Sequence, residues 1–485
     1  MSLEHEELFM DRLPKGDIPK SKEEKEFEKI LNEKLEKMTE RNRMYLEDLF
    51  KALRSTPVNI KNAQVTNSQG FRDGFVSSQL NPLLGLRLTT LEEFLTNIES
   101  VSRNFTKLNL VENMVVSLNS LPKGLFGSRD PTSIDLVPVF NIIPSKKFYA
   151  KTGTNIGNGE GDGYIQFQFK NLFGGAENLI FDAITGTKTQ SSYLVNYNQP
   201  ILNNANYIFE NSAFMNTRKM DHLQSEANVK GISTKLYTQF DSPVNHELVF
   251  ENCWKILRNM NSRSTDVLSQ AGSNIKSSLI YNWKFDSRDN QHLPLNGSLY
   301  RLGLEYNGWF KFNKSPFMKV VLESQNTMKL NKHHSFILTN KSGLLLPFNG
   351  QSYVLDRFYV GGPNDVRSFL LNGIGPKQYG SSVGGDVFLK GGISLVSKFP
   401  RVSEDSNFKL HSFINYGKLI LYDKSKTAFE LVRQLTSEHS VGCGFGILYN
   451  HPMARFELNF VLPIAIHERD GIRKGLQYGI GLTFL

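Results

Sequence analysis

Several short patterns in this sequence contain residue types that can do chemistry, but their spacing or context argues against each one. Gly442-x-Gly444-x-Gly446 is not followed by a helical pattern, as a dinucleotide-binding loop would be. The glycine-rich run 153–163 lacks the Gly-Lys-Ser/Thr of a phosphate-binding loop. We also find no nucleophile paired with a base. The sequence therefore predicts no enzyme activity, no cofactor and no metal site.

Two polar groups need a separate explanation. Asp286, Arg288 and Asp289 combine carboxylates with a guanidinium, which could suggest acid–base chemistry. A proline and a glycine follow closely, so we interpret this group as a network at a strand end and turn. His333 and His334 are adjacent, and neighbouring side chains on a strand point to opposite faces. They are therefore not a shared metal-binding face.

The composition excludes some classes of protein and leaves others open. The chain has 485 residues, two cysteines and a formal net charge of +9. Two cysteines cannot form a disulfide framework or a cysteine-rich zinc site. No apolar run is long enough for a transmembrane helix, and the acidic start resembles neither a signal peptide nor a transit peptide. The positive charge suits nucleic acid, anionic lipid headgroups or an acidic client.

The N-terminal third predicts two different parts. Residues 1–56 form a charged extension, with a helix predicted over Lys22–Leu53 that either is solvated or docks onto a partner or the rest of the chain. Residues 57–145 predict a small β-α-α-β-β module, whose second helix begins at a capping box of Thr90 and Glu93.

From residue 146 onward, short runs of alternating apolar and polar residues replace the helical patterns. The apolar face persists through nearly every run, and the opposite face carries charge and glycine. This pattern favours a transmembrane antiparallel β-barrel of about sixteen strands over a soluble β-sandwich, although a sandwich also alternates. An even strand number would place both barrel ends on one side of the membrane, together with the N-terminal module. Residues 346–382 interrupt the alternation with one long loop.

Motifs in this loop and elsewhere resemble a known family. GGPNDVRSF, in the loop, resembles the loop signature of the bacterial-surface-antigen superfamily of barrel-assembly proteins. The C-terminal segment from HPMARFELNF to GLQYGIGLTFL is similar to the central barrel subunits of the fungal mitochondrial sorting and assembly machinery. DSRDNQHLPLNG and AKTGTNIGNGEGDGYIQF match further patterns of that family. The resemblance extends from residue 57 to residue 485.

The resemblance implies a fold, a location and a function. The fold would be one polypeptide-transport-associated module followed by a sixteen-stranded barrel in the mitochondrial outer membrane, with the module and both termini facing the intermembrane space. The barrel would insert β-barrel precursor proteins sideways into the lipid. Its partners would be those precursors and their β-signals, cytosol-facing subunits of the same machinery, the translocase of the outer membrane, membrane lipid and a possible second barrel copy, but not nucleic acid. The alternative on the same barrel is a passive pore for metabolites or peptides.

The loop motif is the first candidate site. Its residues are Gly361, Gly362, Pro363, Asp365, Val366, Arg367, Ser368 and Phe369. An arginine in an inward-folded loop can pin the loop to a carboxylate of the barrel wall, because its guanidinium is always charged and offers a rigid set of donors. Asp386 and Glu457 are the candidate partners. The family usually has glycine where this chain has Ser368, which suggests a less strained turn here.

The seam between the first and last barrel strands is the second candidate site. The last strand, Lys474–Leu485, has an intact alternating pattern, with the candidate residues Leu476, Gln477, Tyr478, Gly479, Ile480, Leu482 and Phe484. The first, Lys146–Gly157, offers small and polar residues instead: Phe148, Ala150, Thr152, Gly153, Thr154 and Ile156. Small residues and glycine weaken strand pairing. The sequence thus predicts a weak seam that could open and offer an edge to an incoming strand. The last strand also fits the β-signal pattern.

Overall fold

The computed structural model describes residues 22–481, except for 61, 86–87, 121–133, 158–159, 311–312, 400–401, 403–405, 452–453 and 468. The chain divides into two compact units. The first comprises Met1–Thr66, Leu80–Ser102 and Val115–Asn141, and the second comprises Asn67–Gln79, Arg103–Met114 and Ile142–Leu485. No helix among the described residues is long and apolar enough to cross a lipid bilayer.

The N-terminal helix lies where its periodicity predicts it. Helix α2 spans Lys22–Leu53, and its apolar stripe is exposed at Leu35, Met38, Tyr45 and Leu49. The stripe is narrow because charged residues occupy most other positions.

The small sheet that follows is more finely divided than predicted. Its elements are β1 (Pro57–Ile60), β2 (Gln64–Thr66), α3 (Asp73–Leu84), β3 (Leu88–Thr90), α4 (Leu91–Lys107), β4 (Val111–Ser120) and β5 (Ile134–Pro144). The strand order is β2-β5-β1-β3, and β4 pairs with β5 as the predicted hairpin. Val58, Phe94, Val101 and Phe140 are fully buried in this region. The Thr90 hydroxyl accepts a hydrogen bond from the Glu93 amide, at 3.3 Å, at the start of α4.

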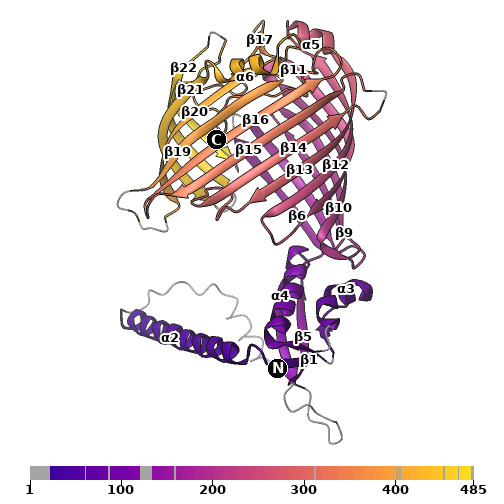
Figure 1. Ribbon diagram of the computed structural model, residues 1–485, viewed down its shortest axis with the longest axis vertical. Coiled ribbons are helices and arrows are strands. Elements are labelled where there is room, and N and C mark those ends of the chain that lie inside the picture. The colour runs from indigo at the N-terminus through magenta and orange to yellow at the C-terminus, as the bar shows by residue number, and fades with distance from the viewer. Residues whose placement is uncertain are drawn as a thin grey trace, which may run out of the picture. The chain divides into compact units, whose positions relative to one another are not determined.

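The remaining strands form one sixteen-stranded antiparallel sheet that curves into a barrel (Figure 1), as the alternation predicts. The strands are β6 (Phe148–Gly157), β7 (Glu160–Lys170), β8 (Asn178–Gly186), β9 (Thr189–Ile201), β10 (Asn204–Met220), β11 (Ser225–Thr238), β12 (Val244–Asn259), β13 (Gly272–Asp286), β14 (Gly297–Asn307), β15 (Phe317–Lys329), β16 (His334–Pro347), β19 (Val387–Lys398), β20 (Phe408–Ile420), β21 (Ser440–His451), β22 (Ala454–Ala465) and β23 (Gly475–Gly481).

The two faces of the wall differ in the way a membrane barrel requires. On β22 the outward Phe456, Leu458 and Phe460 are exposed, whereas the inward Arg455 and Glu457 are buried by contacts inside the barrel. One end of the barrel carries α5 (Thr265–Gln270), α6 (Ala428–Thr436) and the short hairpin of β17 (Lys377–Gln378) and β18 (Ser381–Ser382), as Figure 1 shows. The short helix η1 (Asp221–Leu223) connects β10 to β11.

Candidate functional site

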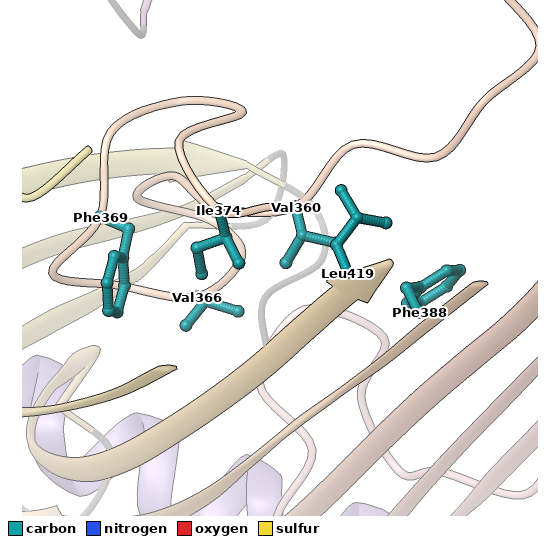
Figure 2. Close-up of a cluster of buried hydrophobic side chains, with 6 residues drawn as sticks. All are labelled: Val360, Val366, Phe369, Ile374, Phe388 and Leu419. Carbon is teal, nitrogen blue, oxygen red and sulfur yellow. The ribbon is translucent and has the colours of Figure 1, made fainter. Parts of the chain in front are cut away.

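The long loop between β16 and β19 occupies residues 348–386, four residues beyond its predicted end. It lies inside the barrel, because its side chains contact the inward residues of β19 to β22. A cluster of six buried apolar side chains joins the loop to this wall: Val360, Val366, Phe369, Ile374, Phe388 and Leu419. Figure 2 shows the first four along the loop, beside Leu419 of β20 and Phe388 of β19. Burial of this cluster fixes the fold of the loop.

Arg367 is fully buried at the centre of the loop. Its Nε and Nη2 donate to the two carboxylate oxygens of Glu457, each at 3.0 Å, which is a two-point contact. Its Nη1 donates to Asn415 Oδ1 at 3.0 Å, and the guanidinium lies 4.6 Å from the centre of the Phe413 ring. Glu457 also accepts a hydrogen bond from the Asn459 side chain and forms an ion pair with Arg455. The predicted contact between Arg367 and Glu457 is therefore present, and we call it the loop clamp.

Asp386 is not part of this clamp, so that part of the prediction is wrong. Its carboxylate accepts a hydrogen bond from the Tyr422 amide at 3.0 Å, and its own amide donates to the Ile420 carbonyl. Asp386 stands immediately before β19 and closes the ladder to the end of β20.

Ser368 adopts the backbone conformation that the family's glycine would take. Its φ is +76°, in the left-handed region that L-residues disfavour. Its hydroxyl is buried without a hydrogen-bond partner among the described residues. A Cβ at Gly442 would lie 2.6 Å from both the Arg367 carbonyl and the Ser368 hydroxyl. Gly442 of β21 therefore makes room for the loop, and the expectation of a less strained turn at Ser368 is wrong.

The first half of the motif shapes the approach to Arg367. Gly361 and Gly362 have φ values of +111° and +132°, which only glycine adopts readily. The Gly361 amide donates to the Asp365 carboxylate at 2.9 Å, and Asp365 forms an ion pair with Lys390 of β19 at 2.7 Å. Pro363 continues this turn.

The loop also holds the last barrel strand. The Ser368 amide donates to the Gln477 side chain at 3.3 Å, and the Asn364 side chain donates to the Ile480 carbonyl at 2.8 Å. Just before β23, Leu370 and Gly471 are joined through their backbones at 2.8 Å, and the Arg473 amide donates to the Ser368 carbonyl at 2.9 Å. The clamp and β23 are thus parts of one hydrogen-bonded assembly.

The two candidate gate strands lie at the two ends of the strand order. Among the described residues no backbone pairing joins β6 to β23, so each keeps one edge unpaired. The outward residues Leu476 and Tyr478 of β23 are 65% and 49% exposed, and Ile480 shares their face. Gln477 and Gly479 face inward, opposite Asn459 and Glu457 of β22. Leu482 and Phe484 lie outside the described residues.

Strand β6 carries the predicted small and polar residues on one face. Phe148, Ala150, Thr152 and Thr154 share one face, and Phe148 is the one large side chain among them. On the other face, a Cβ at Gly153 would lie 2.8 Å from the Tyr164 hydroxyl, so a larger residue there would displace the Tyr164 side chain. Ile156 belongs to the strand, but its side chain is not among those described.

Sequence reasoning missed a second attachment, at the base of the loop. Asp356 is buried and forms an ion pair with Lys255 of β12 at 2.5 Å, while Lys319 of β15 donates to the Asp356 carbonyl at 2.9 Å. The buried Arg357 forms an ion pair with Asp266 of α5 at 2.7 Å. The sequence signal for this attachment is the adjacent pair Asp356 and Arg357 just before the glycine motif, but the partners of both residues are remote in sequence.

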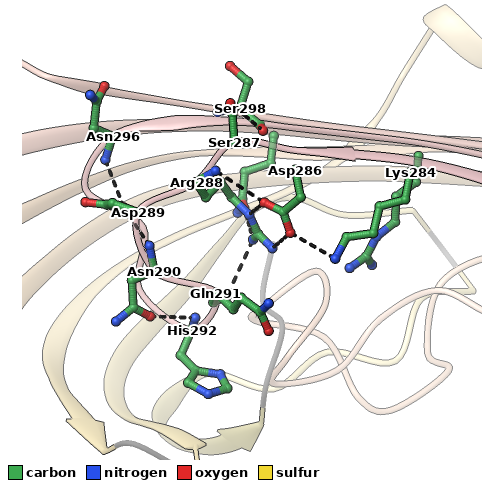
Figure 3. A network of polar contacts seen from close by, with 12 residues as sticks. Lys284, Asp286, Ser287, Arg288, Asp289, Asn290, Gln291, His292, Asn296 and Ser298 are labelled. Atoms are coloured by element: carbon green, nitrogen blue, oxygen red, sulfur yellow. Dashed lines mark hydrogen bonds and ion pairs between the residues drawn. The ribbon is translucent and has the colours of Figure 1, made fainter. Parts of the chain in front are cut away.

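The turn between β13 and β14 is the expected polar network (Figure 3). Arg288 donates to both carboxylate oxygens of Asp286, at 2.8 and 3.0 Å, and Lys284 pairs with the same carboxylate at 3.0 Å. The Asp289 carboxylate accepts from the amides of Asn290 and Asn296. These contacts satisfy backbone amides of the turn and pair the Asp286 carboxylate with two cations.

Comparison with known proteins identifies the family. A model of the Omp85 superfamily domain matches residues 171–484. The chain belongs to the Omp85 superfamily. Among solved structures of that fold, BamA from Haemophilus ducreyi lacking POTRA domains 1–3 matches with a TM-score of 0.69 at 13% identity, covering 87% of this chain and 84% of that one. The Omp85 match covers most of the barrel, and the mixed sheet and helices of the N-terminal module are consistent with a polypeptide-transport-associated domain.

Curated relatives place this Omp85 protein among the Sam50-like barrels. The sorting assembly machinery 50 kDa subunit of Saccharomyces cerevisiae is 31% identical, over 88% of this chain and 94% of the relative. The SAM50-like protein of Schizosaccharomyces pombe is 29% identical, over 92% of this chain and 97% of the relative. The human sorting and assembly machinery component 50 homolog is 28% identical, over 73% and 76%.

Proposed function

We propose that this Sam50-like chain inserts β-barrel precursor proteins into the mitochondrial outer membrane. The observation that carries the proposal is the seam, where β6 and β23 each keep an unpaired edge among the described residues. An unpaired edge offers backbone donors and acceptors to an incoming strand, which would add to the sheet by β-augmentation. The names of the curated relatives, which describe a sorting and assembly machinery, support the same role.

The proposed mechanism needs no covalent step. A precursor strand carrying a β-signal would pair with the β6 edge, whose outward residues are mostly small, while the loop holds β23 in place through Ser368 and Asn364. Further strands would then pair with the first until the new barrel closes and leaves sideways into the lipid. Precursors, the outer-membrane translocase that delivers them, cytosol-facing subunits and a possible second barrel copy are the proposed partners. Both termini and the N-terminal module would face the intermembrane space.

A seam cross-link tests the proposal. Single cysteines at Ala150, Thr152 and Thr154 are combined with single cysteines at Leu476 and Tyr478, in a background with Cys253 and Cys443 replaced by serine. The pair that oxidises fully is used to replace the natural protein in mitochondria. We expect newly imported porin to accumulate unassembled, and reduction of the disulfide to restore its assembly.

The matched control cross-links strands that are already paired. Thr152 and Ile165 face each other across β6 and β7, so cysteines there add a disulfide to the wall without locking the seam. Porin assembly should stay normal in this control. Normal assembly with a locked seam would remove lateral opening from the proposal. Normal porin assembly after complete depletion of the protein, with reduced metabolite flux, would favour the passive pore instead.

A further inference from the structure

The outer wall of β9 to β13 carries a depression that the seam and the loop do not involve. The strand register places one outward residue of each strand in a single row across the wall: Tyr193, Met215, Lys230, Trp254 and Ile275. The next outward row contains Val195, Ala213, Ile232 and Asn252. Because Ala213 and Asn252 are smaller than the residues around them, the wall is hollowed there into a cavity of about 770 Å³.

A lysine at this cavity is unusual for a lipid-facing wall. The Lys230 ammonium lies 4.3 Å from the centre of the Trp254 ring. Among the described outward residues of β9 to β13, the other charged side chains, Lys219, Glu226 and Arg258, lie near the strand ends. Glu226 and Arg258 form an ion pair at 3.5 Å. No ion pair to Lys230 is found among the described residues, so an anion outside the protein is the natural partner for its charge.

The depth of Lys230 indicates where that anion would come from. Lys230 is the sixth residue of β11. At about 3.3 Å per residue and a tilt near 45°, it lies about 12 Å along the barrel axis from the start of the strand. Barrel strands extend beyond the hydrocarbon layer, and Tyr193 and Trp254 stand in the same outward row as Lys230. Aromatic residues form girdles at the lipid–water interfaces of membrane barrels, so we assign this row to the level of the lipid headgroups. A cation costs less there than at the centre of the bilayer, and lipid phosphate is the anion at that level.

The lining of the cavity suits the rest of a phospholipid. Its volume falls within the range of about 300–1,000 Å³ that is typical of ligand sites. Tyr193, Met215 and Ile275 offer apolar contact to an acyl chain. The Asn252 amide opens on the same cavity and has no hydrogen bond to another described side chain, so it can donate to an ester carbonyl of the lipid.

We propose that β9 to β13 hold a glycerophospholipid of net negative charge, with its phosphate bound by Lys230 and one acyl chain seated in the cavity beside Trp254. A zwitterionic lipid is the weaker ligand, because its own ammonium competes with Lys230 for the phosphate. The bound lipid neutralises the lysine and fills a hollow that bulk lipid would fill poorly.

Tryptophan fluorescence tests this proposal directly, because Trp254 lines the site. The chain has three tryptophans, so Trp283 and Trp309 are replaced by phenylalanine in the full-length protein. The protein is reconstituted in vesicles with increasing fractions of phosphatidylglycerol or phosphatidylcholine whose acyl chains are brominated, since bromine quenches nearby indole. We expect half-quenching at a fraction about fivefold lower for phosphatidylglycerol, the size of one modest ion pair.

Two lysine variants separate a site from general attraction between a basic protein and acidic lipid. Lys230→Gln should abolish the preference while leaving quenching by phosphatidylcholine unchanged, and Lys230→Arg should retain it. Lys219→Gln removes an outward lysine near the end of β10 and should leave the preference intact. Equal half-quenching by both lipids in the parent protein, or a preference that survives in Lys230→Gln, would overturn the proposal.

Discussion

Replacing Ser368 by glycine is expected to stabilise the barrel, although the residue lies at the centre of its loop motif. Four terms decide the sign. Relief of a φ of +76° is worth about 1–2 kcal/mol, and removing a buried hydroxyl with no described partner is worth about 1–3 kcal/mol. Glycine gives the unfolded chain more conformational entropy than serine does, which costs about 0.4–1 kcal/mol of stability. The lost contact between the Ser368 Cβ and Gly442 costs about 0.8 kcal/mol. The net gain is about 2 kcal/mol.

Two further variants at the same position separate these terms. Ser368→Ala keeps the strained backbone and removes the hydroxyl, so it should gain about 1–3 kcal/mol. Ser368→Val adds a branched side chain in the left-handed region against Gly442, so it should lose more than about 2 kcal/mol. The free energy of unfolding is measured by urea titration of the barrel in lipid vesicles. If glycine proves neutral or destabilising relative to serine, the strain at Ser368 does not act as described.

Three other changes test the loop and its surroundings. Arg367→Lys keeps the charge but loses the two-point contact, so the free energy of unfolding should fall by about 2–3 kcal/mol in a urea titration. Gly442→Ala should displace the loop and cost about 1–3 kcal/mol, with faster cleavage of the loop by added protease as the readout. Burial lowers the pKa of His222 from 6.5 to about 4, and its ring contacts Tyr359 of the loop. The unfolded state then binds the proton first, so stability should be complete above pH 6.5 and fall by roughly 3 kcal/mol as the pH drops to 4, a loss that urea titration should not find in His222→Phe.

The strands were predictable because lipid and lumen impose opposite demands on alternate residues. Val441 to Tyr449 of β21 and Phe456 to Leu462 of β22 show this alternation in the sequence alone, and the structure pairs these two strands with one register shift near Val441. Strands of two to four residues, such as β3 and β17, are too short for any pattern to appear.

The candidate site was only partly predictable, for a different reason. A buried guanidinium such as that of Arg367 needs a carboxylate partner, and the alternating pattern places Glu457 on the polar, inward face of its strand. Sequence alone could not exclude Asp386, whose carboxylate accepts a hydrogen bond from the Tyr422 amide. Nor could it reveal that Asp356 meets Lys255, because pairs separated by about a hundred residues depend on the closed barrel.

The attachments of the loop make the stiffness of the barrel wall uneven. Its base is fixed to η1, α5, β12 and β15, and its tip to β19, β20, β22 and β23. None of the hydrogen bonds, ion pairs or packed clusters among the described residues joins the loop to β6 through β9. A barrel wall that is supported along one arc deforms more easily where that support is absent. The two borders of the seam therefore differ in their support: the loop is hydrogen-bonded to β23, whereas no contact among the described residues joins it to β6, so widening of the seam should displace β6 more than β23.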